Sequence, residues 1–220
     1  MPAPQNHVLW CVNRSNAGGH ICLYHDTSNL ACDTAPLETL AWKVAGVNPG
    51  VTARFAWPAQ FHLAWTNPGV VRTCGALSLQ DSVCAQFSRN RFGYFFSGTA
   101  PGSNEDRDTA GKHFLAETDG SIPPYNSACL GLGMDGTCAL AIHPAPNRKW
   151  TLTPAPVAAQ AYWLTFGFVG EEGDIISPSC INKPHKIVFP PGAQEMTAVY
   201  QIDGTWISRE GPPGLVLHQQ

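Results

Sequence analysis

The residues of this 220-residue chain that are best suited to hold a ligand lie in the stretch 51–65. Polar residues at even positions, Arg54, Gln60 and His62, alternate there with large apolar residues. Successive side chains of a strand point to opposite faces, so the alternation predicts a strand with one polar and one apolar face. We expect the apolar face to fill an all-β core or to form one wall of a ligand pocket. Its members are the odd-numbered Phe55, Trp57, Phe61, Leu63 and Trp65.

Tryptophan is abundant in the chain and supplies further candidates for a ligand site. The sequence holds seven Trp, ten Phe and five Tyr, whereas only 13% of its residues are charged. Aromatic rings offer wide apolar surfaces, and a wall with few charges suits a neutral ligand. The leading hypothesis is that the protein binds an uncharged, partly apolar small molecule or glycan in an aromatic-lined pocket. The candidate ligand-binding residues are Trp42, Trp57, Gln60, Trp65 and Trp163.

Other interpretations of the same residues stay open. Most of the rings can simply belong to the core, because a pocket wall and a core have similar compositions. A pocket that holds a reactive geometry can also catalyse a cyclisation, with His62 as the candidate general acid or base. Low charge and exposed strand edges would equally suit a self-assembling or storage protein, which would form a homo-oligomer.

The sequence contains no motif typical of a nucleophile, a metal centre or a cofactor. No G-x-S-x-G occurs, and nothing in their neighbours selects Cys74, Cys84 or Cys180 as a nucleophile with a distant histidine. The eight histidines include no H-x-H pair, and the eight cysteines include no C-x-x-C pair. We therefore expect no metal site and no cofactor.

Charge and hydropathy argue against two classes of partner. The net charge is −3 and the basic residues are dispersed, so no groove for nucleic acid and no contact with an anionic membrane are expected. No apolar run approaches the ~20 residues of a membrane helix, and the N-terminal residues lack the features of a signal peptide. We expect a cytoplasmic protein, or one secreted without a classical signal peptide. Disulfide formation depends on that compartment and stays open.

Short β-type segments separated by turn residues recur along the whole chain. This pattern predicts an all-β, single-domain antiparallel β-sandwich over residues 1–220, with a distorted β-barrel as the alternative. A loose tail is expected from about residue 209. The pairs Asp135-Gly136 and Asp203-Gly204 each predict a tight hairpin, because Asp-Gly favours the turn that joins two adjacent strands.

Two further segments carry more specific expectations. The segments His7–Asn13 and His20–Tyr24 read as the two strands of a hairpin, in which Cys11 would lie opposite Cys22. The segment Leu37–Val44 has the spacing of a short helix, but a strand is equally compatible with it.

Several blocks of the sequence occur in an order that resembles one protein family. They are AGGHICLY at 17–24, LAW at 40–42, the stretch 51–65, LGLGMDGT at 130–137, YWLTFG at 162–167, IVFPP at 187–191, and 196–206. Together they resemble the rhizosphere-expressed RhiA-type proteins of bacteria and fungi, from about Asn13 to Trp206. The resemblance implies a soluble, abundant, all-β protein linked to colonisation or secondary metabolism, with no established reaction to transfer. The chain departs from the family pattern in its additional cysteines and in a charged loop around 104–108.

Overall fold

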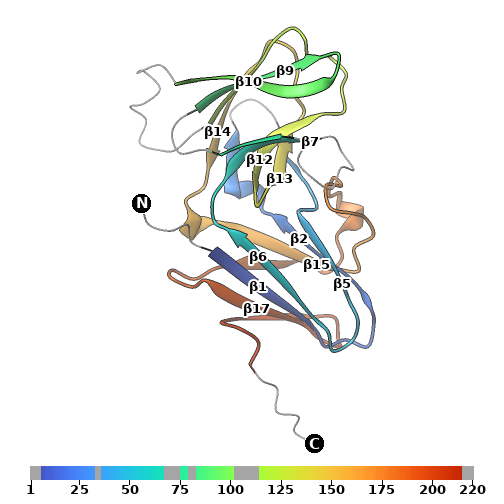
Figure 1. Cartoon of the computed structure of the whole chain (residues 1–220). Coiled ribbons are helices and arrows are strands. Elements are labelled where there is room, and N and C mark those ends of the chain that lie inside the picture. The colour runs from blue at the N-terminus through green and yellow to red at the C-terminus, as the bar shows by residue number, and fades with distance from the viewer. Residues whose placement is uncertain (1–5, 33–35, 67–74, 79–82, 102–113, 215–220) are drawn as a thin grey trace, which may run out of the picture.

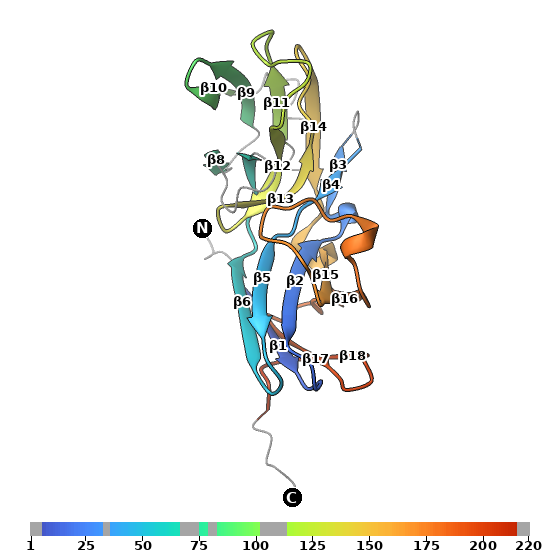
Figure 2. The ribbon, with the colours of Figure 1, turned by 90° about the vertical axis from the view of Figure 1, so that its right-hand side faces the viewer.

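The computed structural model describes residues 6–32, 36–66, 75–78, 83–101 and 114–214. The charged loop around 104–108 and Cys74 lie outside these ranges. The described residues form four β-sheets and contain no α-helix, as the sequence pattern predicts. Two sheets face each other in the lower half of the elongated molecule and two in the upper half (Figures 1 and 2). None of the four described sheets closes into a barrel, so the β-sandwich is confirmed.

The lower half consists of two four-stranded sheets. In the first sheet β1 is central, between β17, which runs parallel to it, and β6, which runs antiparallel. Its strands, in spatial order, are β18 (Trp206–Glu210), β17 (Glu195–Tyr200), β1 (Asn6–Asn13) and β6 (Thr52–Pro58). The strands of the facing sheet, in spatial order, are β16 (His185–Val188), β15 (Ala161–Phe166), β2 (Gly19–His25) and β5 (Lys43–Val47).

The upper half consists of two five-stranded sheets. The strands of one, in spatial order, are β10 (Gly93–Pro101), β9 (Val83–Asn90), β11 (Phe114–Thr118), β14 (Lys149–Pro154) and β3 (Leu30–Cys32). Those of the other are β4 (Glu38–Thr39), β13 (Thr137–Ile142), β12 (Cys129–Met134), β7 (His62–Thr66) and β8 (Gly75–Ser78). Besides β1 with β17, only β9 with β11 pairs in parallel among the described strands, so the predicted antiparallel arrangement applies to the other pairs.

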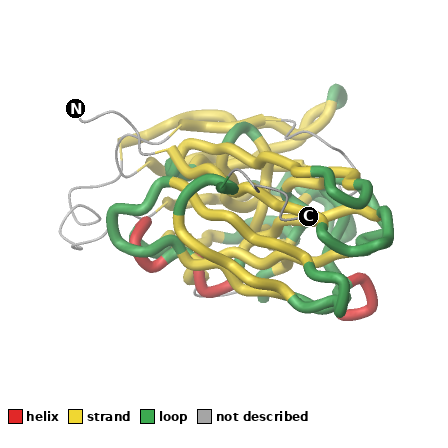
Figure 3. Tube along the Cα trace, turned by 90° about the horizontal axis from the view of Figure 1, so that it is seen from below, coloured by secondary structure: helices red, strands yellow, loops and turns green. Residues whose placement is uncertain are grey.

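Short 3-10 turns are the only helical elements of the described chain. They are η1 (Thr27–Asn29), η3 (Val157–Ala159) and η4 (Pro178–Cys180). In a view along the long axis they lie at the margin, while strands fill the middle (Figure 3). The predicted helix alternative at Leu37–Val44 is therefore wrong, because this segment contributes to β4 and β5 instead.

The chain passes between the two halves four times, namely from β2 to β3, from β4 to β5, from β6 to β7 and from β14 to β15. The stretch 51–65 forms one of these crossings. Its first part is β6 of the lower half and its second part is β7 of the upper half, with a break at residues 59–61. All five of its odd-numbered apolar residues are buried, so the apolar face predicted from the alternation is core.

The predicted hairpins have different outcomes. Strands β12 and β13 pair around Asp135-Gly136, and β17 and β18 pair around Asp203-Gly204, as predicted. In contrast, β1 and β2 belong to facing sheets, so the predicted hairpin between them is wrong. Cys11 lies opposite Ala53 and Ala198 rather than opposite Cys22. Long-range pairing of β1 with β6 and β17 replaces the local pairing that the turn residues suggested.

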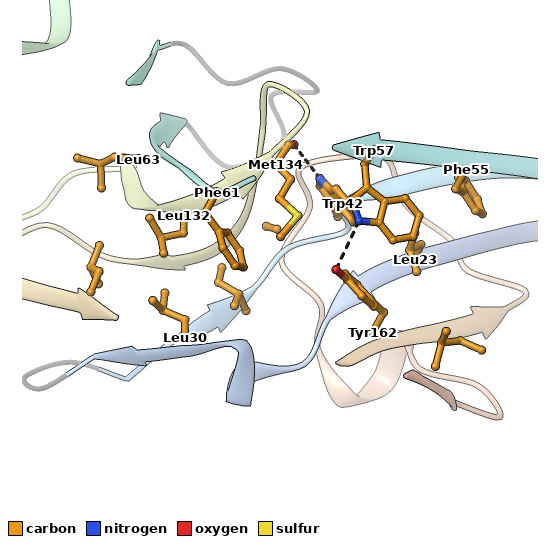
Figure 4. Close-up of a cluster of buried hydrophobic side chains, with 14 of the residues drawn as sticks. Leu23, Leu30, Trp42, Phe55, Trp57, Phe61, Leu63, Leu132, Met134 and Tyr162 are labelled. Carbon is orange, nitrogen blue, oxygen red and sulfur yellow. Dashed lines mark hydrogen bonds between the residues drawn. The ribbon is translucent and has the colours of Figure 1, made fainter. Parts of the chain in front are cut away.

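The last strand extends past the predicted start of the tail. Strand β18 runs to Glu210, so Arg209 and Glu210 pair with β17 and belong to the sheet rather than to a tail. The cysteines for which the structure gives a state, a set without Cys74 and Cys84, are all free thiols. One continuous cluster of buried apolar side chains, including Leu9, Trp57 and Leu132, extends through both halves (Figure 4).

Glycine at position 131 allows a close approach of two core strands. A Cβ atom at this position would lie 1.9 Å from the carbonyl oxygen of Leu140 on the adjacent β13. We predict that Gly131→Ala forces β12 and β13 apart and lowers the free energy of unfolding by about 2–3 kcal/mol. Urea-induced unfolding measures this change.

The matched control is Gly46→Ala in β5. A Cβ atom there would lie 3.6 Å from the ring of His20, which is ordinary contact. This substitution is expected to change the free energy of unfolding by no more than about 0.5 kcal/mol. Equal effects of the two substitutions would contradict the close approach.

Candidate functional site

Aromatic rings from segments that connect the two halves meet in one buried cluster. Trp42 lies between β4 and β5, Trp57 is near the end of β6, and Tyr162 is near the start of β15. His25 ends β2. Each of these four crossing segments therefore contributes a ring. We call the following set the junction cluster: His7, His25, Trp42, Trp57, Phe61, Tyr162 and Phe189.

The rings of the junction cluster pack directly against one another. The ring centroids of Trp42 and Trp57 are 5.1 Å apart and those of Trp57 and Tyr162 are 5.2 Å apart, both edge to face. The ring of His7 lies edge to face with that of Phe189 at 4.2 Å. Edge-to-face pairs are favourable beyond the area they bury, because the positive ring edge meets the negative ring face.

Hydrogen bonds fix the polar atoms of these rings. The Trp42 Nε1–H donates to the carbonyl oxygen of Met134 in the upper half, at 3.3 Å (Figure 4). The Trp57 Nε1–H donates to the hydroxyl oxygen of Tyr162 at 3.4 Å, and that hydroxyl donates to Gln160 Oε1 at 2.8 Å. The rings are thus held in position from both halves of the molecule.

Two histidines of the junction cluster are buried with unpartnered ring nitrogens. His25 is 1% exposed; its Nδ1 accepts from the amide of Asn29 at 3.1 Å, while its Nε2 has no partner. Neither ring nitrogen of His7 has a hydrogen-bond partner. Burial lowers the pKa of both side chains, and that of His25 falls to about 3. Both rings are therefore neutral at physiological pH.

The residues predicted to bind a ligand do not form one wall. Trp42 and Trp57 are 1% and 2% exposed, so protein side chains already occupy the space around their rings. Trp65 packs against Phe87 and Tyr94 in the upper half. Trp163 is half-buried on β15, where its Nε1–H donates to Asp26 Oδ2 at 2.7 Å.

The two predicted polar candidates also lie apart. Gln60 is exposed in the connection between β6 and β7. His62 is 8% exposed on β7 and its Nε2 has no hydrogen-bond partner. Burial lowers the pKa of the His62 imidazole, against an opposing effect of Asp135. A candidate acid or base in such a position would need a neighbouring polar group, and the structure gives none at this nitrogen.

A surface depression lies instead on the polar, even-numbered face of β6. It has a volume of about 410 Å³ and is lined by Arg54, Ala56 and Pro58 of β6. Trp57 borders it as well, although that residue is only 2% exposed. The remaining lining residues, from β1 and from the start of β17, are Asn6, Val8, Gln194 and Glu195.

A half-buried tryptophan flanks this depression. Trp10 shares a face with Val8, because the two residues are two positions apart on β1. Its Nε1–H donates to Glu195 Oε2 at 3.4 Å, and the guanidinium carbon of Arg54 lies 5.4 Å from the centre of its ring. Sequence analysis missed Trp10 and Glu195, since 185 residues separate them and only the parallel pairing of β1 with β17 brings them together.

A second depression, of about 330 Å³, is lined mainly by the connection between β1 and β2 and the connection between β17 and β18. Its aromatic members Phe166 and Tyr200 are each only 6% exposed and stack on each other at 4.2 Å. Both rings are therefore nearly closed to solvent, whereas the ring of Trp10 is only half-buried. The depression beside Trp10 is the better candidate site.

The model of the RhiA family matches residues 4–211. The chain belongs to the RhiA family. The match extends from β1 to just past β18, so the four sheets of this RhiA protein all fall within the matched range. No curated protein and no solved structure matches the chain. The family description assigns no reaction to this RhiA protein.

The described parts of the chain contain no helix that is long and apolar enough to cross a membrane.

The buried histidines of the junction cluster predict how stability depends on pH. The unfolded chain binds a proton at His25 near pH 6.5, whereas the folded chain does so only near pH 3. The unfolded state therefore binds more protons, and His25 should lower the free energy of unfolding by about 1.4 kcal/mol for each pH unit as pH falls below 6.5. His7, whose pKa is also lowered by burial, contributes with the same sign. Urea unfolding between about pH 7 and pH 5 measures this slope.

The variant His25→Asn keeps an acceptor for Asn29 and removes the titrating group. It should reduce the slope, whatever its effect on absolute stability. His20→Asn, at an exposed histidine of β2, should leave the slope unchanged. An unaltered slope in His25→Asn would contradict a neutral, buried His25.

Proposed function

We propose that this RhiA protein binds an uncharged glycan, or a similar hydroxylated and partly apolar small molecule, in the depression beside Trp10. The observation that carries the proposal is the arrangement of a half-buried indole between a cation and a carboxylate, Arg54 and Glu195, at the edge of a surface depression. The ligand class is the one that the aromatic-rich, charge-poor sequence predicts.

The charges around the depression favour a neutral ligand. Arg54 and Glu195 carry opposite charges, so the lining has no net charge to attract an ion. Their guanidinium and carboxylate groups offer donors and acceptors, and the amides of Asn6 and Gln194 offer both. Hydroxyl groups of a sugar can satisfy such groups without leaving a buried charge unpaired.

The apolar part of the site suits the less polar face of a sugar ring. Val8, Ala56 and Pro58 provide apolar lining, and Val8 shares a face of β1 with Trp10. A rigid aromatic side chain loses little conformational entropy on binding, and its ring offers a flat apolar surface. The depression is open rather than enclosed, which suits a terminal or internal unit of a longer glycan.

The alternative enzyme function has less support. His62 lies on β7 of the upper half and does not line the depression. Self-association, the second alternative, would use the same outer face of the first lower sheet, because Ile207 of β18 is 57% exposed there and Val199 lies opposite it. The test of the glycan site therefore includes the state of association.

We predict that Trp10→Ala weakens glycan binding by about tenfold or more, which corresponds to about 1.4 kcal/mol. A glycan array identifies the ligand, and calorimetric titration of wild type and variant then gives the affinities. Binding of a neutral ligand should persist at about 1 M salt, where the Debye length is only about 3 Å. Light scattering at the working concentrations reports association.

Trp163→Ala is the matched control. Trp163 is also half-buried, with its indole N–H on Asp26 and with Lys186 Nζ 5.5 Å from its ring centre, but it lies on β15 of the facing sheet. This substitution should leave binding unchanged. An equal loss of glycan binding in both variants would refute the proposal. The proposal would also fail if no glycan binds and Trp10→Ala instead abolishes self-association.

A further inference from the structure

Three side chains with metal-binding atoms meet on one face of an upper sheet. Glu38 belongs to β4, Cys129 begins β12, and His143 directly follows β13. Glu38 lies opposite Ala141, which is two residues from His143, and Ala141 lies opposite Gly131, which is two residues from Cys129. Residues two apart on a strand share a face, so all three side chains project from the same side of this sheet.

The three side chains are close enough to act together. One possible ligand atom from each lies within 4.8 Å of the others. His143 Nε2 is 3.2 Å from Glu38 Oε2, and His143 Nδ1 is 4.0 Å from Cys129 Sγ. Cys129 is buried, whereas the side chains of Glu38 and His143 are 33% and 51% exposed. The sheet therefore closes the cluster on one side, and solvent reaches the cluster past the imidazole of His143.

We propose that Glu38, Cys129 and His143 form a binding site for a divalent zinc-type ion, with a fourth position open to solvent. Thiolate sulfur, imidazole nitrogen and carboxylate oxygen are the three ligand types that zinc uses in proteins. Calcium and magnesium favour oxygen ligands alone, so the sulfur donor argues against them. The site is distinct from the depression beside Trp10, which lies in the lower half.

To enclose an ion, the three ligand atoms have to draw together and the imidazole of His143 has to turn. Bond lengths of about 2.3 Å to sulfur and about 2.0–2.1 Å to nitrogen and oxygen place tetrahedral ligand atoms about 3.3–3.6 Å apart. The His143–Glu38 distance of 3.2 Å already agrees with this value. An imidazole binds a metal through one nitrogen only, so His143 has to turn until one nitrogen faces both partners. Its exposure allows this rotation, and the thiol proton of Cys129 passes to solvent on binding.

Cys129, His143 and Glu38 also resemble a catalytic set, with a thiol as nucleophile, an imidazole as base and a carboxylate that orients the base. The surroundings of the sulfur argue against that role. Cys129 is 0% exposed, so a substrate carbonyl has little access to Sγ. Burial, and then the charge of Glu38, raise the pKa of the Cys129 thiol to about 11, which keeps a metal-free thiolate rare at neutral pH. A small cation can enter beside His143 and stabilise the thiolate by its own charge.

Cobalt(II) binding to the purified full-length protein tests the proposal. The protein is stripped of metal with a chelator, kept reduced, and titrated with Co²⁺ and then with Zn²⁺. We expect stoichiometric Co²⁺ binding with the near-ultraviolet charge-transfer band of a thiolate ligand and the visible bands of a tetrahedral ion, both displaced by Zn²⁺. Zn²⁺ should also raise the thermal unfolding midpoint, because it binds the folded state.

The variants separate this site from other cysteines and histidines. Cys129→Ala should abolish the charge-transfer band. Glu38→Gln or His143→Gln, at side chains that are 33% and 51% exposed, should weaken Zn²⁺ binding by about tenfold or more. Cys138→Ala is the matched control, because Cys138 is a buried cysteine of the same sheet and the same buried group of residues. It should keep the band and the affinity.

Three results would overturn the inference. The first is the absence of saturable Zn²⁺ binding in folded wild-type protein. The second is a Co²⁺ spectrum without thiolate character, or one that Cys138→Ala removes and Cys129→Ala does not. The third is rapid alkylation of Cys129 at neutral pH that Zn²⁺ fails to slow, which would point to a reactive free thiol instead.

Discussion

The structure depends on the packing of aromatic rings where the chain crosses between its two halves. Each of the four crossings brings a ring into the junction cluster: His25 from β2, Trp42 before β5, Trp57 from β6, and Tyr162 from β15. Edge-to-face contacts near 5 Å and the bonds from Trp42 to Met134 and from Trp57 to Tyr162 hold these rings together. Because no half is built from one continuous segment, neither sandwich can complete its sheets until these crossings are in place. The cluster thus couples local side-chain geometry to the topology of all four sheets.

This constraint leaves the outer faces of the sheets as the surfaces that a ligand can reach. The interior around Trp42 and Trp57 is filled, and its histidines are kept neutral by burial. The chemically versatile groups that stay accessible lie on the opposite sides of the strands. In the lower half these are Trp10, Arg54 and Glu195, and in the upper half they are Glu38 and His143 next to the buried Cys129. Both sets combine residues from strands far apart in the sequence, and a sheet places such strands about 5 Å apart.

The predictions from sequence were accurate where structure depends on near neighbours. Alternation in 51–65 identified the buried face of β6, although both faces of β7 are buried. Asp-Gly identified both tight hairpins, because these signals depend only on backbone geometry within a few residues. The same reasoning wrongly paired β1 with β2, since the turn residues 14–19 suit a hairpin equally well whether the strands pair or enter facing sheets. It also grouped Trp65 and Trp163 with Trp42, although the three rings lie in different parts of the molecule.

The sequence by itself determined an all-β sandwich, membership of the RhiA family over residues 4–211, and a chain rich in aromatic residues and poor in charge. Only the tertiary structure decided which residues stand beside the even-numbered face of β6. The pairing of β1 with β17 brings Glu195 to Trp10, and the order β4-β13-β12 brings Glu38 to Cys129 and His143. The physical reason is that strands pair so that whole sheet faces become buried against one another. No short segment of the sequence specifies which faces these are.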